Sequence, residues 1–442
     1  MAMRMYDIID KKKKGFELTP KEITYMVEGY VAGEIPDYQV SAFLMAVYYE
    51  GMSEKELSVF TDSMAKSGDM VDLSQIKGIK VDKHSTGGVG DKTTLAVAPL
   101  VAACGGRVAK MSGRGLGFTG GTIDKLESIP GMQTAISEER FFEIVNDIGL
   151  SVIGQSAEIA PADKKLYALR DVTATVDSIP LIAASIMSKK LASGSDKIVL
   201  DVTVGSGAFM KNIDDAICLA QRMVEIGENA GRQTVAILTN MDVPLGEAVG
   251  NDIEVVEAIE TLQGKGSEDF RQICVEFAAY MLYLGEIADL ETSRKMVEDA
   301  IDYGKGIDKL AAMVKAQGGD ESYIYHPEKF EKAPYQKDFV MKKSAYIKSM
   351  DTEKCGKTSV VLGAGRETKE SQIDSKAGLR FYHKTGEYVK QGEVLARLYA
   401  SDEEKLNQAV QYLKTAYKYS DTPVEPMKEI IAYVTKDGVY KQ

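Results

Sequence analysis

Two glycine-rich turns, each between a short apolar run and a helix-like segment, constrain the fold of this chain more than any other feature. The first is VDKHSTGGVGDK at residues 81–92, and the second is KMSGRGLGFTGGTIDKLE at residues 110–127. Glycine lets a backbone approach a ligand closely and adopt positive φ, so such turns can direct several N–H groups at one anion. Two of them so close in sequence predict one phosphate-binding site on two neighbouring strands.

The order of segments around these turns predicts a parallel sheet. Short strands are expected at 79–81 and 108–111, with a helix at 93–103 between them. This strand–turn–helix–strand order is typical of a βαβ unit, in which ligands bind beyond the carboxyl ends of the strands. Both glycine turns are expected at that edge.

Neither turn matches a common nucleotide motif. The P-loop pattern GxxxxGK[ST] is absent, and so is GxGxxG with its following acidic residue. A nucleoside triphosphatase or a dehydrogenase is therefore disfavoured. The turns instead carry cationic and hydroxyl side chains suited to phosphate, among them Lys83, Ser85, Thr86, Thr93, Thr94, Lys110, Ser112, Arg114 and Thr122.

The chain has 442 residues, which is too long for one compact domain. Segments 1–67 and 161–194 have helical patterns, and we expect them to form one discontinuous helical domain. Segments 74–160 and 195–335 are expected to form a mixed-sheet α/β domain that carries the phosphate turns. Short runs with many turns at 345–442 predict a small C-terminal α+β domain. The predicted fold class is therefore α/β with a helical and a small α+β domain.

The charge and composition of the chain exclude several classes of binding partner and site. The net charge of -12 disfavours nucleic acid and anionic membranes. The sequence shows no secretory signal and no apolar run of membrane-spanning length, so a cytoplasmic protein is expected. The 4 cysteines form no CxxC pair, which indicates neither a zinc site nor a disulfide framework.

Four stretches resemble the signatures of the thymidine and pyrimidine-nucleoside phosphorylases. They are KHSTGGVGD at 83–91, SGRGLGFTGGTIDKLE at 112–127, APADKKLYALRDVTATVDSIPLIAASIMSKKLA at 160–192 and VGSGAFMK at 204–211. The resemblance runs along essentially the whole chain. It implies reversible phosphorolysis of pyrimidine nucleosides such as uridine, thymidine and deoxyuridine. Phosphate would attack C1′ with inversion, giving the free base and α-D-ribose 1-phosphate or its 2-deoxy form.

The resemblance also implies an architecture. The family binds phosphate on its α/β domain and the base on its helical domain, with a cleft between them. Inorganic phosphate is the co-substrate, and no organic cofactor is expected. A homodimer joined through the helical domain is implied as well. The apolar helices of 1–67 suit a dimer interface and also suit packing against each other, so both interpretations stay open.

The signatures carry the family's ligands onto this chain residue by residue. The implied phosphate ligands are Lys83, Ser85, Thr94, Lys110, Ser112 and Thr122, and the implied base ligands are Arg170, Ser185 and Lys189. Ser185 and Lys189 are four residues apart, so they share one helix face. Arg170 and Lys189 can donate to pyrimidine carbonyl oxygens, and the Ser185 hydroxyl can pair with N3–H. The alternative for Lys189 is a surface lysine.

His84 completes the implied catalytic set with Arg170 and Lys189. It lies inside the first turn, where the family's histidine approaches O2 of the pyrimidine. Donors at the base oxygens stabilise the negative charge that gathers on the departing base. His84 either donates a hydrogen bond or passes a proton as general acid. The alternative is an imidazole that only orders the turn.

A structural potassium ion is implied by some bacterial members. The matching ligands are the backbone carbonyls of Gly90, Lys92, Leu245 and Ala248 and the Glu257 carboxylate, which are oxygen atoms suited to a hard cation. Relatives often have threonine where this chain has Lys92, although lysine also occurs in the family. A carbonyl ligand tolerates this change, but a nearby ammonium would compete with the ion. A second departure is Phe118, where most relatives have histidine. We expect Phe118 to alter substrate preference or affinity.

Two other functions compete with this one. The first is a related glycosyltransferase such as an anthranilate phosphoribosyltransferase, which uses a diphosphate leaving group with magnesium. The pyrimidine-binding residues and the C-terminal domain argue against it. The second is a sensor that keeps the pocket without catalysis, which the presence of His84, Arg170 and Lys189 disfavours. The residues do not decide between uridine and thymidine.

Overall fold

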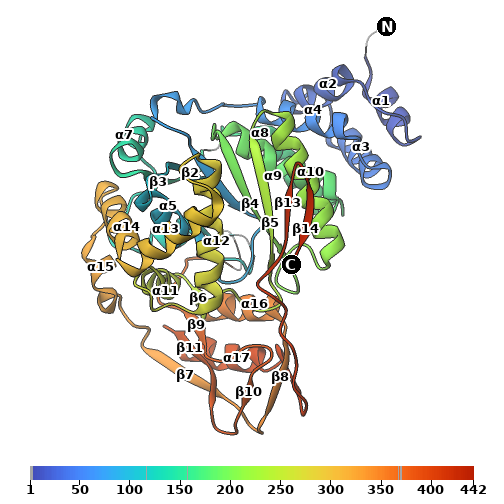
Figure 1. Cartoon of the computed structure of the whole chain (residues 1–442). Coiled ribbons are helices and arrows are strands. Elements are labelled where there is room, and N and C mark those ends of the chain that lie inside the picture. Colours follow the sequence, from blue (N-terminus) through green and yellow to red (C-terminus); the bar gives the residue numbers. More distant parts are fainter. Residues whose placement is uncertain (1–2, 116, 157, 367, 369–370) are drawn as a thin grey trace.

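The computed structural model describes residues 3–115, 117–156, 158–366, 368 and 371–442. Figure 1 shows N-terminal helices at the upper right, a central sheet flanked by helices, and a smaller C-terminal region below the sheet. None of the helices in the described part of the chain is long and apolar enough to cross a membrane.

The helical region combines two distant segments of the chain. Its helices are α1 (Met5–Lys12), α2 (Pro20–Val31), α3 (Asp37–Glu50), α4 (Glu54–Ala65), α8 (Pro161–Val172) and α9 (Ile179–Ala192). Helix α8 packs against α2, α3 and α4, and α9 packs against α4. Thr19 and Ser53 begin α2 and α4 with capping boxes, which pair side chains with the unpaired N–H groups of the first turn.

The central sheet is mixed, as predicted. Its strands are β1 (Val81–Ser85), β4 (Lys197–Val204), β5 (Gln233–Asn240), β13 (Ile430–Thr435) and β14 (Gly438–Lys441), in that order. β1, β4 and β5 are parallel, whereas β13 pairs antiparallel with β5. The parallel pair β2 (Val108–Ser112) and β3 (Leu150–Gly154) lies beside β1, joined through a parallel bridge between Lys80 and Arg107.

Helices cover both faces of this sheet. The helices of the α/β segments are α5 (Thr93–Ala103), α6 (Thr122–Leu126), α7 (Glu138–Ile148), α10 (Ile213–Asn229), α11 (Asp252–Leu262), α12 (Glu268–Leu284), α13 (Leu290–Asp302), α14 (Lys305–Ala316) and α15 (Ser322–Tyr325). Alternate residues of β4 point to opposite faces. Ile198 and Leu200 join the core shared with α9 and α10, whereas Val199 joins the core shared with α5 and α12.

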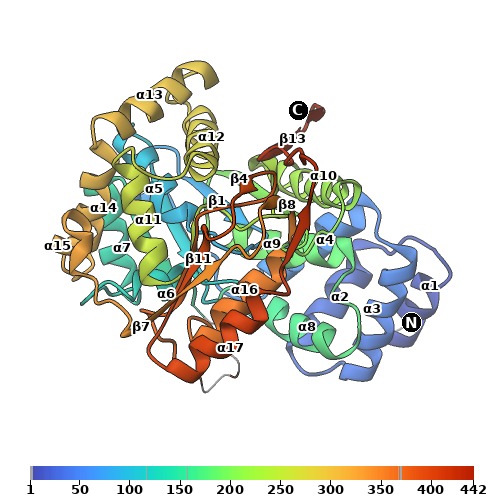
Figure 2. The same cartoon turned by 90° about the horizontal axis from the view of Figure 1, so that it is seen from below.

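The C-terminal region is built from two small sheets and two helices. Its elements are β7 (Tyr335–Val340), β8 (Ala345–Met350), α16 (Thr352–Leu362), β9 (Gly378–Phe381), β10 (Tyr388–Val389), β11 (Val394–Ala400), α17 (Glu403–Leu413) and β12 (Tyr417–Ser420). Figure 2 shows α16 and α17 packed side by side. The strand β6 (Ala248–Gly250), from the α/β segment, pairs with β9 and extends one of these sheets.

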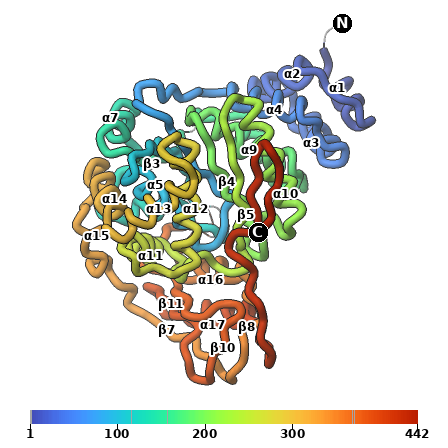
Figure 3. Tube along the Cα trace, in the orientation of Figure 1, coloured from blue at the N-terminus to red at the C-terminus, as the bar shows by residue number. Residues whose placement is uncertain are grey.

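The end of the chain differs from the prediction. Residues 345–442 were expected to form one separate domain, but β13 and β14 leave it and complete the central sheet. Figure 3 shows this hairpin, in red, running beside the green strand β5. An edge strand leaves unpaired N–H and C=O groups, and β13 satisfies those of β5. Pairing of this kind depends on distant residues, so the local pattern at 430–441 does not reveal it.

Candidate active site

The two glycine turns begin at the same edge of the sheet. β1 ends at Ser85 and β2 ends at Ser112, and the bridge between Lys80 and Arg107 makes these two strands parallel neighbours. Thr94 lies in the first turn of α5, and Thr122 is the first residue of α6. The structure therefore brings the hydroxyl groups predicted to bind phosphate to one edge.

Hydrogen bonds to β4 support the first turn. The Thr86 and Thr203 hydroxyls lie 3.0 Å apart, and the Thr203 N–H donates to Thr86 Oγ1 at 3.0 Å. The Thr203 hydroxyl also donates to the Gly87 carbonyl. Gly87 has φ of 96°, which a residue with a side chain rarely adopts. These bonds fix the backbone of the turn before any ligand arrives.

Lys83 is buried at the base of this turn. Its ammonium lies 2.9 Å from Asp201 Oδ2 and 3.8 Å from Asp91 Oδ1, and it also donates to Thr93 Oγ1. Burial opposes the charge, but the carboxylates of Asp201 and Asp91 outweigh it and raise the pKa of Lys83. The structure thus provides a permanently charged ammonium below the turn, already paired with carboxylates.

Lys110 lies in a buried network with residues that the sequence did not single out. Its ammonium donates to the Lys83 carbonyl and lies 3.3 Å from Asp82 Oδ1, while Lys190 Nζ lies 2.8 Å from Asp82 Oδ2. Burial, with the nearby ammonium groups of Lys190 and Lys83, lowers the pKa of Lys110 to about 8. For Asp82, the two lysines overcome burial and lower the pKa to about 2.

Asp82 therefore joins the phosphate side of the site to the helical side. It lies on β1, whereas Lys190 lies on α9, next to the predicted base ligand Lys189. A signal for both was present in the sequence: an acidic residue inside a short strand, and a lysine in an almost continuously apolar helix. A buried charge in either place requires a partner.

The second turn is organised by Asp124. Its carboxylate accepts the Gly115 N–H at 2.7 Å and is paired with Arg114 at 3.1 Å and with Arg366 at 2.8 Å. Arg366 follows α16, so the C-terminal region helps to hold this turn. A Cβ on Gly121 would lie 2.1 Å from the Gly115 nitrogen, which only glycine avoids. Neither Asp124 nor Arg366 was predicted from the sequence.

Phe118 contacts the C-terminal region as well. A Cβ on Gly356 of α16 would lie 2.8 Å from the Phe118 carbonyl oxygen and 2.9 Å from its ring. The ring packs against the apolar core that α16 shares. This contact supports the second turn; the predicted effect on substrate preference stays a prediction.

His84 lies on β1 just before the first turn, and its imidazole is partly accessible. Burial and the nearby ammonium groups of Lys190 and Lys110 lower its pKa well below the ordinary value, although Asp82 opposes them. Lys189 also contributes to this lowering, so charged groups on both β2 and α9 affect the pKa of His84. The imidazole is therefore neutral at neutral pH, with one N–H to donate.

On the helical side, Ser185 and Lys189 share one face of α9. Lys189 Nζ lies 3.3 Å from Ser185 Oγ and donates a hydrogen bond to Asp163 Oδ2 on α8. Among the described residues, the other oxygen of Asp163 is buried without a hydrogen-bond partner. Asp163 was not predicted, and it orients the Lys189 ammonium.

Arg170 is placed differently from the other base-side residues. Its buried guanidinium donates to the carbonyls of Thr175 at 3.2 Å, Val176 at 2.6 Å and Leu181 at 3.1 Å. Burial lowers its pKa. These bonds fix the connection between α8 and α9, so Arg170 shapes the base-side segment in this structure.

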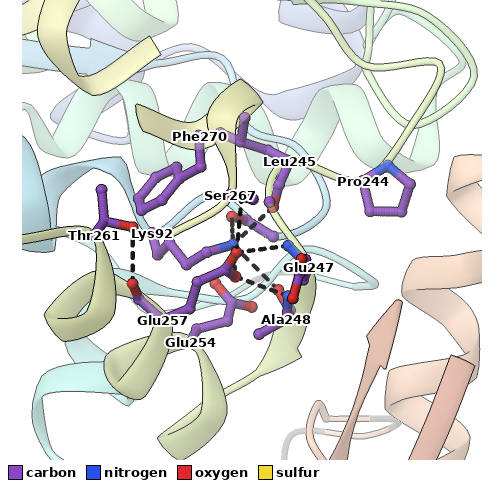
Figure 4. Close-up of polar contacts among 12 residues, drawn as sticks. Lys92, Pro244, Leu245, Glu247, Ala248, Glu254, Glu257, Thr261, Ser267 and Phe270 are labelled. Carbon is purple, nitrogen blue, oxygen red and sulfur yellow. Dashed lines mark hydrogen bonds and ion pairs between the residues drawn. The ribbon is translucent and has the colours of Figure 1, made fainter. Parts of the chain in front are cut away.

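The residues predicted to hold potassium also meet, but around an ammonium group. Lys92 is fully buried, and Figure 4 shows its Nζ among the Leu245 and Ala248 carbonyls and the Glu257 carboxylate. It also donates to the Gly90 carbonyl. The Lys92 carbonyl instead accepts the Leu95 N–H at 2.9 Å. These residues do not fit an added potassium ion, because the Lys92 side chain lies where the ion would be coordinated.

A cavity of about 820 Å³ lies elsewhere, between the loop after β5 and the C-terminal region. Its lining includes Asp242, Asp269, Lys384 and Glu429. Among the described residues, it contains none of those predicted to bind phosphate or pyrimidine. We therefore assign the candidate active site to the glycine turns and α9.

Comparison with protein families matches all three regions of the chain. Residues 6–68 match the glycosyl transferase family helical bundle domain, and residues 77–307 match the glycosyl transferase family a/b domain. Residues 346–420 match the pyrimidine nucleoside phosphorylase C-terminal domain. Among solved structures, anthranilate phosphoribosyltransferase from Thermus thermophilus has a TM-score of 0.57 at 17% identity, covering 70% of this chain and 99% of its own. That likeness shows the fold alone.

Individual pyrimidine-nucleoside phosphorylases are much more similar to this chain in sequence than that structure is. The chain is 52% identical over 424 residues to pyrimidine-nucleoside phosphorylase of Geobacillus stearothermophilus, covering 96% of this chain and 98% of the relative. It is 53% identical over 403 residues to that of Staphylococcus epidermidis, covering 91% and 93%. With this identity along nearly the whole chain, and with family models that match all three of its regions, the protein belongs to the pyrimidine-nucleoside phosphorylase family and is a glycosyltransferase enzyme.

Proposed function

We propose that this enzyme catalyses the reversible phosphorolysis of uridine, thymidine and deoxyuridine, with inversion at C1′. The observation that carries the proposal is that the strand leading into the first glycine turn contacts α9, the helix that carries Ser185 and Lys189. That contact pairs Asp82 with Lys190, and His84 lies on the same strand.

Phosphate would be bound by the turns. The hydroxyls of Ser85, Thr94, Ser112 and Thr122 supply neutral donors at the strand edge. Lys110 supplies a charge that responds to phosphate: a dianion beside it favours its protonated form. Lys83 adds a fixed positive charge below the first turn. Such preorganised donors hold the nucleophile without reorganisation during the reaction.

The base would leave toward α9. As the bond from a phosphate oxygen to C1′ forms, the bond from C1′ to N1 of the base breaks, and its electron pair remains on the pyrimidine. The pyrimidine anion then takes up a proton from solvent to give the free base. Lys189 and Ser185 can donate to that pyrimidine, and Asp163 fixes the lysine. Phosphate bound on the turns would attack C1′ from the side opposite a base held by α9, and such a displacement inverts C1′.

The neutral state of His84 favours one of its two proposed roles. An imidazole with so low a pKa holds no extra proton at neutral pH to transfer to the base. It can still donate its single N–H to O2, where negative charge gathers. We therefore propose His84 as a hydrogen-bond donor to the leaving base.

We also propose a homodimer through the helical region. Three tyrosines on α1 and α3 are strongly exposed: Tyr6 at 67%, Tyr38 at 73% and Tyr49 at 78%. Tyrosine is enriched at protein interfaces, and these residues lie on the helices implied by the family. Light scattering of the purified chain tests this, and a monomeric mass would contradict it.

The activity is tested by base release. The chain is incubated with each nucleoside, with and without phosphate, and free base is measured by liquid chromatography. We expect base only with phosphate; absence of base for every pyrimidine nucleoside would refute the proposal. NMR of the sugar phosphate separately tests inversion, since a β-anomer would contradict in-line displacement.

A further inference from the structure

The strongest unexplained feature is the setting of the Lys92 ammonium. Its Nζ lies 2.9 Å from the Gly90 carbonyl oxygen, 2.7 Å from that of Leu245 and 3.2 Å from that of Ala248. The Glu257 carboxylate lies 2.8 Å away. Three neutral carbonyls and one carboxylate are a ligand set for a hard monovalent cation as much as for an ammonium. The lysine thus supplies the cation from within the chain.

Other bonds hold these oxygens in place. The Glu257 carboxylate also accepts the backbone N–H groups of Glu247 at 2.6 Å and Ala248 at 2.8 Å. The Leu245 N–H donates to the Val89 carbonyl at 3.0 Å. Because the cage does not depend on Lys92 alone, its oxygens are expected to keep their arrangement when the lysine side chain is shortened.

Close backbone approach gives the cage its shape. A Cβ on Gly90 would lie 2.5 Å from the Leu245 carbonyl oxygen. A Cβ on Gly246 would lie 2.5 Å from Glu257 Oε1 and 2.7 Å from Lys92 Nζ. Glycine at both positions lets three segments converge on one point: the end of the first phosphate turn, the loop before β6, and α11.

We propose that the Lys92 ammonium replaces a bound potassium ion in this chain, and that shortening Lys92 converts the cage into a potassium site. The ammonium then connects the first phosphate turn to α11 through its contacts with Gly90 and Glu257, and this connection does not depend on which salt is present. The intact chain gains no specific stabilisation from potassium, whereas a variant with threonine at this position does.

Thermal unfolding tests this in chloride salts of potassium, sodium and N-methylglucamine at equal ionic strength. Wild type should have the same Tm in all three. Lys92→Thr should lose on the order of 5 °C or more without potassium, because Glu257 loses its partner, and should recover most of that loss in potassium. Lys92→Met should lose stability in every salt, since its side chain still fills the cage without charge.

Lys125 provides a matched control. Its buried ammonium lies 2.7 Å from Glu254 Oε2 on the same helix α11, and within the described ranges the Asp91 carbonyl is the single further acceptor of its hydrogen bonds. Lys125→Ala should therefore be destabilised without selective recovery in potassium. Equal recovery of both variants would mean a general salt effect and would overturn the proposal.

Direct detection gives a second readout. Crystals soaked in rubidium chloride should show an anomalous peak among the four oxygens in Lys92→Thr and none there in wild type. A peak at that place in wild type overturns the proposal, as does a folded Lys92→Thr with no peak and no potassium response. If the variant does not fold, the wild-type Tm and soak still decide whether the intact chain binds the ion.

Discussion

Replacing Asp82 by asparagine should change how the enzyme's phosphate affinity depends on pH. Asp82 is a buried carboxylate placed between two ammonium groups, at 3.3 Å from Lys110 and 2.8 Å from Lys190. Asparagine has nearly the same shape, so Asp82→Asn removes the charge and leaves the packing. The residue that should respond most is Lys110, because its pKa already lies low, at about 8.

The structure sets the size of this effect. With an effective dielectric constant of about 20, a unit charge 3.3 Å away contributes about 5 kcal/mol. A shift of one pKa unit corresponds to about 1.4 kcal/mol. Losing even a third of the Asp82 contribution is enough to bring the pKa of Lys110 below 7. The variant should therefore have a mostly neutral Lys110 at pH 7 before phosphate binds.

Steady-state phosphorolysis of uridine between pH 6 and pH 9 measures the consequence. In wild type, Lys110 carries its charge below about pH 8 and loses it above, so the KM for phosphate should rise above about pH 8. In Asp82→Asn that rise should begin below pH 7. If about half of the Asp82 contribution is lost, the pKa of Lys110 falls by about two units, to about 6, and its protonated fraction at pH 7 falls about tenfold. At pH 7 the KM for phosphate should then be on the order of tenfold higher. The KM for uridine should change less.

Asp196→Asn is the control. Asp196 also pairs with a lysine, Lys80, at 2.9 Å, but its side chain is 34% exposed and lies outside the site. It should leave both KM values and their pH profiles unchanged. Removing one partner of a buried ion pair costs about 3–5 kcal/mol, so the folded state of Asp82→Asn is checked by circular dichroism. A folded variant with the wild-type profile of KM for phosphate would refute the reasoning.

Three further predictions concern the same site. Lys189→Ala should lower kcat/KM for uridine, with a loss of about 2–4 kcal/mol of transition-state stabilisation, while the KM for phosphate changes little. A kcat/KM near the wild-type value would exclude the base-side role. His84 is neutral when folded but protonates below about pH 6.5 when unfolded, so urea unfolding should show stability falling from pH 7.5 to pH 5.5, by up to about 1.4 kcal/mol per pH unit. His84→Asn should flatten that slope, and an unchanged slope would contradict the assignment. Gly121→Ala should raise the KM for phosphate measured in the same assay, because its Cβ would meet the Gly115 nitrogen at 2.1 Å, and an unchanged KM would show that the second turn is not held so tightly.

Local patterns were sufficient for the parallel core of the fold. Glycine turns after short apolar strands predicted two parallel strands with α5 between them, and the structure has this unit. The first strand was predicted at 79–81, but β1 is Val81–Ser85, so Lys83 and His84 lie on the strand and not in the turn. The patterns were not sufficient for the last strands. β13 is short and alternates in burial, which suits any half-covered strand, and its partner β5 is remote in the sequence.

The same limit applies to the site. The resemblance supplied hydroxyl and cationic residues, but it did not supply the carboxylates that hold them. Asp82 meets Lys190 across 108 positions of sequence, a pairing that neither local pattern contains. For Lys92, the sequence did show a lysine at the predicted potassium site. It did not show that the side chain enters the site, because that direction depends on the loop that carries Leu245 and Ala248.

The hairpin of β13 and β14 has a consequence for the order of events during synthesis. β5 ends at Asn240, and its partner β13 begins at Ile430, which the ribosome adds about 190 residues later. At typical translation rates this interval lasts about 10–40 s. Throughout it the nascent chain presents one open strand edge, the kind of surface that pairs with other chains. Completion of the central sheet is thus a late step in the formation of the fold. Chains truncated before Ile430, which lack β13 and β14, should be substrates for chaperones.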